Sequence, residues 1–331
     1  MDILVIRFSS LGDVVMATAV VETLHREIHE PRIHILTKKE YVQVFEGDRR
    51  IEKIVTIDGH EKPFEILKKL GRRNFDAVID LHSSIRSRAV GIFLHSPLKM
   101  RIKKHSLIRR IMILTHNRFR RRFDVLGSYL DTLKPLGINE RVLPHLMLSE
   151  KARTVADKFL SGFEKIALGF APGAKHTTKR WNEDSYAYLA DEAARQGYFP
   201  VFIGDKSETA VVDRIRKRMS EESISIAGEV NLAETCVVIS RLCGLVTNDS
   251  GMMHIAGALS TPFVAIFGPT HPDLGFVPGY PSGIIMHSGA DCSPCSVHGQ
   301  TPCRLKQRVC MDDITWEMVM SELQHVVNIR I

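Results

Sequence analysis

The sequence predicts an α/β fold made of two Rossmann-like, doubly wound domains that face a central cleft. The chain has 331 residues, which is more than a single hydrophobic core usually serves. Short runs rich in Val and Ile alternate with segments of helical period, which is typical of parallel sheets covered by helices. The alternation weakens at residues 137–153, where Pro144 and polar residues indicate a linker, and then starts again. We therefore expect domains at residues 1–150 and 151–331.

The elements of the first domain follow from its apolar runs. The run DILVIR at the start is typical of a buried strand. Strands are expected at residues 2–7, 33–36, 53–57 and 75–81. A helix is expected at residues 13–29, because its apolar residues recur at helical spacing.

The second domain repeats this alternation. Strands are expected at residues 165–170, 200–203, 223–226, 244–247 and 262–267, and helices at residues 183–196, 208–219, 232–241 and 252–259. A last helix is expected at residues 314–326, and it is a candidate for packing back on the first domain.

The composition is that of an ordinary globular protein. Hydrophobic residues make up 44% of the chain and charged residues 25%, which excludes a disordered or collagen-like protein. No run of about 18 apolar residues occurs, so no membrane-spanning helix is expected. The amino terminus lacks the features of a signal peptide, and six cysteines are too few for a disulfide scaffold. These features favour a cytoplasmic protein.

The net charge of +7 is concentrated in one segment. Residues 81–123 contain twelve Lys and Arg residues and no acidic residue, whereas the rest of the chain has 33 basic and 38 acidic residues. Such a segment attracts nucleic acid, anionic lipid headgroups or phosphorylated substrates, unless it is simply a solvated face. Nucleic acid is less favoured, because the segment has few aromatic residues on which bases could stack.

The loop after the first strand contains a carboxylate in a position suited to chemistry. Ligands of open parallel sheets bind beyond the carboxyl ends of the strands. This loop, FSSLGD, is neither a G-x-G-x-x-G nor a P-loop motif. Gly12 permits a tight turn, and Asp13 lies at the start of the helix. Asp13 is either a helix cap or a carboxylate held ionised by the helix dipole and able to accept a proton.

The corresponding loop of the second domain, residues 171–181, is suited to phosphate. It offers small residues, two hydroxyls and several cations before a helix. Backbone N–H groups, hydroxyls and ammonium groups all bind phosphate oxygens. Thr178 and Lys179 are the candidate donor-binding residues here, and Lys179 is the best candidate for a diphosphate contact; the alternative is an ordinary basic loop.

Two further loops of the second domain end at the same sheet edge. In NDSGMMH, Asp249 or Ser250 can cap the next helix, and Gly251 allows a ligand to approach the backbone. His254 lies one turn further on, where we expect it to face the same end of the helix. In GDKSE, Glu208 is either a ribose contact or the start of a helix.

Four cysteines are close in sequence near the carboxyl end. Cys292, Cys295, Cys303 and Cys310 are spaced C-x2-C-x7-C-x6-C. Only the first pair has the spacing of metal ligands, so reduced thiols are favoured over a zinc site, which stays the alternative.

These motifs together resemble glycosyltransferase family nine, the ADP-heptose:lipopolysaccharide heptosyltransferases. The matching pieces occur in family order over almost the whole chain: RFSSLGDVVMA, FAPGAKHTTKRW, IGDKSE, NDSGMMHIAGAL and FGPT. The resemblance implies a GT-B fold and inverting transfer of heptose from ADP-heptose to a lipopolysaccharide-core acceptor. Ala19 and Asn182 stand where members often have proline, which affects the subgroup rather than the function.

The resemblance also implies roles for individual residues. Asp13 would be the general base, Lys179 would contact the diphosphate and Glu208 the ribose. The nucleotide and phosphate side of the site would consist of Asp249, Ser250, Gly251 and His254. No cofactor is expected, and because the sequence has no D-x-D motif, no metal-bridged diphosphate is expected either.

The acceptor would meet the first domain and the basic segment. Ser10 and Gly12 are expected beside the acceptor, and Arg120, Arg121 and Arg122 are expected to bind its acidic groups at the inner face of the inner membrane. The alternatives are a transferase or an epimerase for another nucleotide sugar and, less favoured, a non-catalytic RNA-binding protein.

Overall fold

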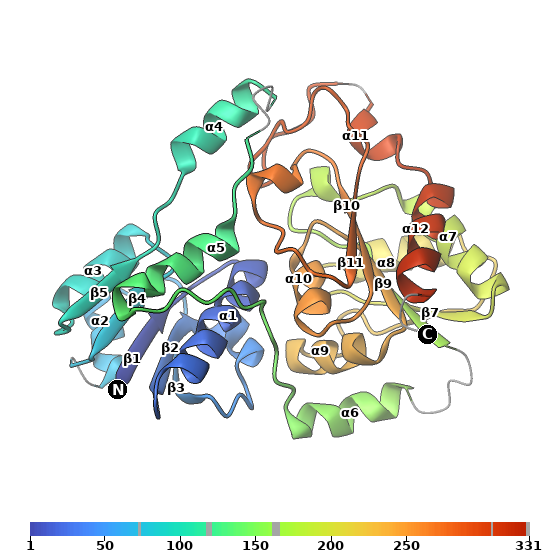
Figure 1. Ribbon diagram of the computed structural model, residues 1–331. Coiled ribbons are helices and arrows are strands. Elements are labelled where there is room, and N and C mark those ends of the chain that lie inside the picture. Colours follow the sequence, from blue (N-terminus) through green and yellow to red (C-terminus); the bar gives the residue numbers. More distant parts are fainter. Residues whose placement is uncertain (72–73, 117–120, 161–165, 306, 329–331) are drawn as a thin grey trace. The chain divides into compact units, whose positions relative to one another are not determined.

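The structure is a computed structural model that describes residues 1–71, 74–116, 121–160, 166–305 and 307–328 (Figure 1). The chain divides into two compact units. The first unit consists of Met1–His105 with Asp124–Glu150, and the second of Ser106–Phe123 with Lys151–Ile331. Each unit has one parallel sheet with helices, as the fold class predicted from the sequence requires. Ser106–Phe123 lies within the predicted first domain but groups with the second unit.

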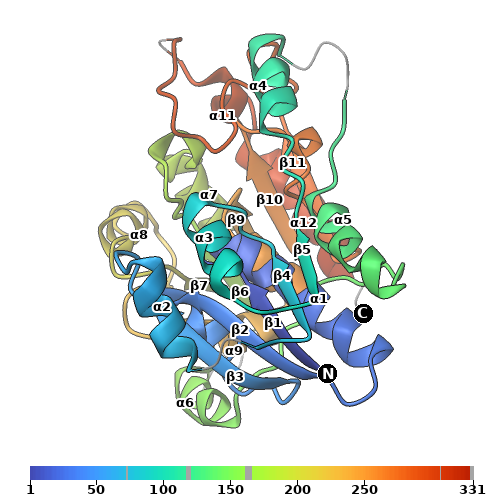
Figure 2. The ribbon, with the colours of Figure 1, turned by 90° about the vertical axis from the view of Figure 1, so that its left-hand side faces the viewer.

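The first unit has a five-stranded sheet of order β3-β2-β1-β4-β5. Its strands are parallel throughout and run side by side in Figure 2. They are β1 (Asp2–Ile6), β2 (Arg32–Lys38), β3 (Ile51–Ile57), β4 (Ala77–Asp80) and β5 (Leu98–Arg101). Ile6, the last residue of β1, is in register with Leu36 and Asp80, so the carboxyl ends of the central strands share one edge.

The helices of the first unit begin at polar caps. They are α1 (Leu11–Glu27), α2 (Pro63–Leu70), α3 (Ile85–Phe93) and α5 (Val125–Leu130), with the 3-10 helices η1 (Lys39–Val44) and η2 (Asp131–Leu136). Ser10 and Asp13 form a capping box at the start of α1, and Ser84 caps α3 by accepting from the Ser87 N–H group. Every residue of β1 is buried, as a central parallel strand requires.

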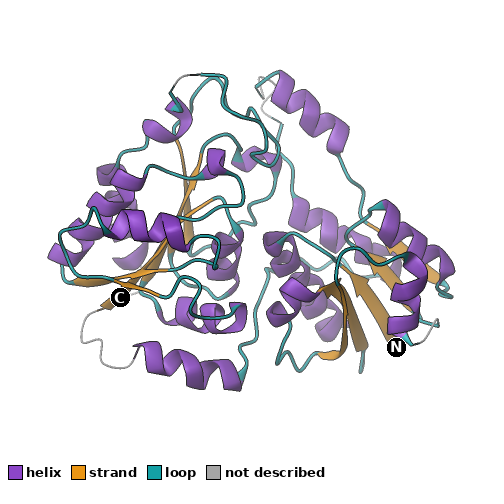
Figure 3. Ribbon diagram, turned by 180° about the vertical axis from the view of Figure 1, so that it is seen from behind, coloured by secondary structure: helices purple, strands orange, loops and turns teal. Residues whose placement is uncertain are grey.

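The second unit has a six-stranded parallel sheet of order β11-β10-β9-β6-β7-β8. The strands are β6 (Ile166–Ala171), β7 (Tyr198–Phe202), β8 (Ile224–Ser225), β9 (Gly244–Asn248), β10 (Phe263–Phe267) and β11 (Gly283–His287). Figure 3, which colours helices and strands separately, shows the helices that accompany this sheet. Its core combines Phe170, Trp181, Tyr186 and Phe202 with aliphatic side chains of the helices.

The helices of the second unit include one from the basic segment. They are α4 (Ser106–Leu114), α6 (Glu150–Leu160), α7 (Glu183–Arg195), α8 (Thr209–Arg216), α9 (Leu232–Arg241), α10 (Gly251–Ala258), α11 (Val309–Asp312) and α12 (Trp316–Asn328), with the 3-10 helices η3 (Thr177–Lys179) and η4 (Pro272–Leu274). The last helix, α12, packs against α7 and against β9, β10 and β11 of its own unit. The sequence had made it a candidate for packing on the first domain, which stays a prediction.

The predicted strands and helices are present with small shifts at their ends. The helix predicted at residues 232–241 matches α9 fully, whereas the strand predicted at residues 223–226 shortens to β8. The sequence analysis missed β5, β11 and the helices α2 to α6 and α11. In the described part of the chain, no helix has the length and apolarity needed to cross a bilayer.

Candidate active site

Asp13 lies just beyond β1, at the start of α1, and its carboxylate is bound by the loop that precedes it. The Ser10 backbone N–H donates to Asp13 Oδ2 over 3.1 Å, and the Ser10 hydroxyl donates to the same oxygen over 2.8 Å. Ser10 is the N-cap of α1, and Asp13 completes its capping box, which is close to one of the two roles predicted for Asp13. Ser10 and Gly12 shape this loop, with Gly12 buried inside the first turn of α1.

Two residues from distant parts of the first unit complete the surroundings of Asp13. Arg7, which follows β1, places Nη2 2.7 Å from Asp13 Oδ2 and donates through Nη1 to the Leu81 carbonyl over 2.6 Å. The Tyr129 hydroxyl of α5 donates to Asp13 Oδ1 over 3.0 Å. Oδ2 thus accepts from three donors and Oδ1 from one. Because each oxygen has two lone pairs, Oδ1 is the atom with room for a further proton donor.

Asp13 is ionised at neutral pH. Burial on its own would raise its pKa, but the Arg7 charge and the hydrogen bonds from Ser10 and Tyr129 together lower the pKa below the ordinary value. The Arg7 pKa is raised despite burial, because Asp13 and Tyr129 stabilise its charge. The ion pair is nearly enclosed, with side-chain exposures of 10% for Arg7 and 16% for Asp13.

Two further basic groups, His82 and Lys104, act on Asp13 electrostatically. Burial and then the Arg7 charge lower the pKa of His82 to about 3, so its ring is neutral at pH 7. The His82 ring lies 4.8 Å from the Phe8 ring. Burial and then Arg7 also lower the pKa of Lys104, while Asp80 and Asp13 oppose that shift. The positive charges of Arg7 and Lys104 and the neutral ring of His82 therefore lie near the Asp13 carboxylate.

In the second unit, the predicted phosphate loop is joined to the start of α10. Lys179 Nζ lies 2.6 Å from Asp249 Oδ2, and the Thr270 hydroxyl donates to the same oxygen over 2.6 Å. Lys179 follows β6, Asp249 follows β9 and Thr270 follows β10. Three neighbouring strands thus bring three of the predicted motifs together at one sheet edge, in the arrangement expected for an anion site.

The loop that carries Lys179 is fixed from both sides. The buried Asn248 side chain accepts from the Trp181 N–H over 3.0 Å and donates to the Pro172 carbonyl over 2.8 Å. The Thr178 hydroxyl donates to the Gly299 carbonyl. Thr178 is thus engaged with the cysteine-containing loop, which the sequence had not indicated.

Glu208 precedes α8 and reaches toward the phosphate loop. It accepts from the Asp205 N–H over 3.0 Å. A Cβ atom on Gly173 would lie 1.9 Å from Glu208 Oε1, so the glycine allows the carboxyl group to pass close to the loop. Burial is the main cause that raises the pKa of Glu208, and the Asp205 charge adds to it, whereas the hydrogen bond from Asp205 and the charge of Arg180 oppose the rise.

Ser250 and Gly251 lie at the start of α10, and His254 lies one turn further along the helix. Ser250 caps the helix by accepting from the Met252 N–H over 3.3 Å, and Gly251 is its first residue. His254 was expected to face this end. Its side chain is buried, with the ring edge-to-face on Tyr280 at 6.3 Å between centroids. Its place in the donor site stays a prediction.

The predicted acceptor arginines group with the second unit rather than with Asp13. Arg122 pairs with Asp273, with Nε 3.1 Å from Oδ1, and the Phe123 N–H donates to the Asp273 carbonyl over 2.9 Å. Arg121 is exposed, and Arg120 lies outside the described residues. The basic segment therefore connects to both units, through Lys104 to the first and through Arg122 to the second.

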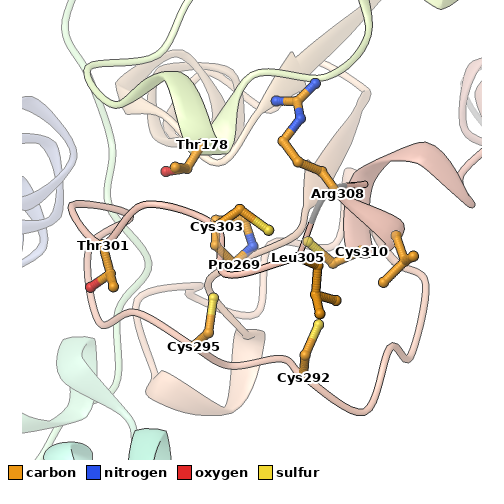
Figure 4. A pocket seen from close by; sticks show the side chains of 10 residues that line it. Thr178, Pro269, Cys292, Cys295, Thr301, Cys303, Leu305, Arg308 and Cys310 are labelled. Carbon is orange, nitrogen blue, oxygen red and sulfur yellow. The ribbon is translucent and has the colours of Figure 1, made fainter.

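The four cysteines line one small cavity together with Thr178, Pro269 and Arg308 (Figure 4). All four are free thiols. Burial and the neighbouring thiols raise the pKa of Cys310 to about 12, so it stays protonated at neutral pH. No group of three or more His, Cys, Asp or Glu side chains within the described ranges is placed to hold a metal ion.

The two parallel sheets, each with helices and with polar loops beyond its carboxyl edge, define the class of fold, the GT-B type. The family model of glycosyltransferase family 9 (heptosyltransferase) matches residues 64–305, nearly three-quarters of the chain. The chain therefore belongs to glycosyltransferase family 9.

Individual relatives agree with this assignment. The chain is 28% identical to the lipooligosaccharide heptosyltransferase 2 of Haemophilus influenzae over 297 residues, covering 82% of this chain and 84% of the relative. The lipopolysaccharide heptosyltransferase 2 of Escherichia coli is 26% identical, covering 83% and 84%. The solved structure of E. coli ADP-heptose lipopolysaccharide heptosyltransferase II has the same fold, with a TM-score of 0.78, 22% identity and coverage of 100% and 99%. A family 9 structure from Veillonella parvula has a TM-score of 0.81, with 23% identity and coverage of 99% and 97%.

Proposed function

We propose that this heptosyltransferase transfers heptose from ADP-heptose to an anionic acceptor of the lipopolysaccharide core, with inversion at the anomeric carbon. The observation that carries the proposal is the Asp13 carboxylate, which is ionised and has an open position on Oδ1. The relatives support the choice of substrates, since they are named for lipopolysaccharide or lipooligosaccharide and one for ADP-heptose.

Asp13 acts as the general base in this proposal. The acceptor hydroxyl hydrogen-bonds to Oδ1, its oxygen forms a bond to the anomeric carbon, and the bond from that carbon to the diphosphate breaks. The proton moves to Asp13, and ADP leaves with the electron pair. A carboxylate of lowered pKa is a weak base, so the proton is transferred late, when bond formation has made the hydroxyl acidic. One displacement inverts the anomeric centre, so a second catalytic carboxylate is not required.

The second unit stabilises the departing ADP. Lys179 supplies positive charge, and the first N–H groups of α10 after Ser250 donate to phosphate oxygens. Asp249 and Thr270 orient Lys179 before the donor arrives. Thr178 and Gly251 border the diphosphate, Glu208 contacts the ribose, and His254 belongs to the nucleotide and phosphate side of the site. These groups perform the role that a metal ion has in other transferases, so we propose a metal-independent reaction.

The acceptor in this proposal is a lipid at the inner face of the inner membrane. Arg121, Arg122 and the undescribed Arg120 attract its acidic groups, and the enzyme is a peripheral protein of that surface. Ser10 and Gly12 border the acceptor hydroxyl. Nucleic acid is not expected as a partner.

The test is Asp13→Asn and Asp13→Ala assayed with ADP-heptose and a panel of truncated core acceptors. Loss of a general base lowers the transfer rate by about 10²–10⁴-fold, whereas ADP binding to the second unit should stay within twofold of wild type. The wild-type enzyme should consume donor only when acceptor is present, because an epimerase would consume it alone. Near-normal turnover of both variants would remove Asp13 from its role.

A further inference from the structure

Exposed hydrophobic side chains are concentrated in the basic segment. Eleven large hydrophobic residues among the described ones are exposed, and six of them lie within residues 81–123. These six are Ile85, Ile92, Phe93, Leu107, Ile111 and Leu114. Three lie on α3 of the first unit and three on α4 of the second. Soluble surfaces usually expose such residues singly, so each helix face is a candidate for cover by another molecule.

Helix α4 presents an exposed face with three apolar residues and one arginine. Leu107, Ile111 and Leu114 are 70%, 45% and 80% exposed, and the exposed Arg110 lies among them. Their spacing of i, i+3, i+4 and i+7 places all four on one side of the helix. Met112 faces the other way and is buried. The helix thus packs through one side and leaves its apolar side uncovered.

Helix α3 repeats this pattern within the first unit. Ile85, Ile92 and Phe93 are 90%, 71% and 57% exposed, and Arg88 is exposed between them. Ser87, Val90 and Gly91 form the buried side. The Arg88 guanidinium donates to the Ser83 hydroxyl over 3.2 Å, so the basic residue of this face points back toward the sheet edge that carries Asp80.

The charges around these faces decide what covers them. Residues 81–123 contain no carboxylate, and Lys99, Lys103, Arg110 and Arg121 are exposed. A second copy of the chain in an isologous contact through the α4 face would oppose Arg110 to Arg110, which is unfavourable. Apolar residues with surrounding Lys and Arg are the composition of helices that lie in the interface of an anionic bilayer.

We propose that α3 and α4 are membrane-docking helices, each of which inserts its apolar face into the headgroup region of an anionic bilayer. The docking rests on the proposed function, since it delivers the enzyme to a lipid acceptor. Docking by insertion differs from electrostatic attraction of Arg120–Arg122 to the membrane, because insertion of apolar side chains persists when salt screens the charges.

The experiment measures co-sedimentation with phosphatidylglycerol–phosphatidylethanolamine vesicles and with phosphatidylcholine vesicles. Wild type should bind the anionic vesicles and retain part of its binding at 0.5 M NaCl, where screening of exposed charges is nearly complete. The variants L107S/I111S/L114S and I92S/F93S, which keep every charge, should each bind at least tenfold more weakly. Met318→Ser removes a 47% exposed residue of α12 and should bind as wild type.

A second readout reports insertion itself. Leu107→Trp should show a blue-shifted emission on addition of anionic vesicles, relative to the wild-type spectrum, whereas Met318→Trp should not. Wild-type-like binding of both serine variants, or a concentration-dependent dimer that the serine variants abolish, would overturn the proposal. All docking variants should transfer heptose normally to a delipidated acceptor; if wild type does not, the proposed function fails independently of docking.

Discussion

The pair of Arg7 and Asp13 shows how one residue combines a structural and a chemical role. Asp13 Oδ2 closes the capping box of α1 and accepts from Arg7, while Oδ1 accepts from the Tyr129 hydroxyl. Breaking a nearly enclosed ion pair on one side costs about 3–5 kcal/mol, because the remaining charge stays buried. These contacts therefore hold the carboxylate in one orientation, and they also lower its pKa, which makes it a weaker base.

Tyr129→Phe tests this balance at the residue scale. The Tyr129 hydrogen bond lowers the pKa of Asp13, so its removal raises that pKa and moves the acidic limb of kcat/KM to higher pH. In wild type, the lowered pKa keeps Asp13 ionised in mild acid. In the variant, Asp13 is protonated at a higher pH, so the variant should lose activity in mild acid before wild type does. The free energy of unfolding should fall by about 1.5–3 kcal/mol, the usual worth of a hydrogen bond to a charged group.

The control for Tyr129→Phe is Tyr188→Phe, since Tyr188 is exposed on α7. Its pH profile should coincide with that of wild type. A Tyr129→Phe profile that also coincides with wild type would show that Asp13 ionisation does not limit the reaction.

At the scale of elements, Asn248 couples the phosphate loop to β9. Its side chain accepts from the Trp181 N–H and donates to the Pro172 carbonyl. These two backbone groups are 67 and 76 residues from Asn248 in sequence and lie at opposite ends of the phosphate loop. Asn248→Ala leaves both unsatisfied and should lower the free energy of unfolding by about 2–5 kcal/mol. The affinity for ADP should also fall, as measured by calorimetry.

Asn182→Ala is the matched control for Asn248→Ala, because Asn182 caps α7 at the end of the same loop. Loss of this cap should cost about 1 kcal/mol and leave ADP affinity unchanged. Equal effects of the two variants on ADP affinity would contradict the role of Asn248.

The close approach of Gly173 and Glu208 gives a second test at this scale. In Gly173→Ala, the new Cβ would overlap the Glu208 carboxyl group, which lies at the end of a flexible side chain and can move away. We expect KM for the donor to rise at least fivefold, with little change in thermal stability. In Gly173→Ala combined with Glu208→Ala, the glycine substitution should add no further effect. Gly279→Ala, which has open space, is the control.

At the scale of the whole molecule, the sequence predicts the sheets better than it predicts the site. Strands such as β1 and β10 are short apolar runs in which every residue is buried, so they are visible without any tertiary information. The parallel arrangement then predicts that loops after neighbouring strands meet, which Lys179, Asp249 and Thr270 do.

The parts that sequence analysis missed depend on distant contacts. Tyr129 is 116 residues from Asp13 and has no local signal. Arg7 could have been predicted as a site residue, because it is a charged residue directly after a buried strand. The burial of His254 reflects packing on Tyr280, which is set by a segment outside the motif. Helices α3 and α4 escaped prediction because their apolar residues lie on an exposed face and do not follow a core pattern.

The division into two units predicts where ADP, without its sugar, protects the chain from hydrogen exchange. Every donor contact proposed here belongs to loops that follow β6, β7, β9 and β10 of the second unit. Saturating ADP should slow exchange at residues 172–181, 204–208, 249–254 and 268–270, and should raise the stability of the second unit by about 2.7 kcal/mol at a concentration of 100 Kd. Lys179→Ala should reduce the protection in all four loops, because it weakens diphosphate binding, whereas Arg26→Ala on α1 should leave it unchanged. Protection centred on residues 8–13 would place the nucleotide beside Asp13 and contradict the assignment of donor binding to the second unit.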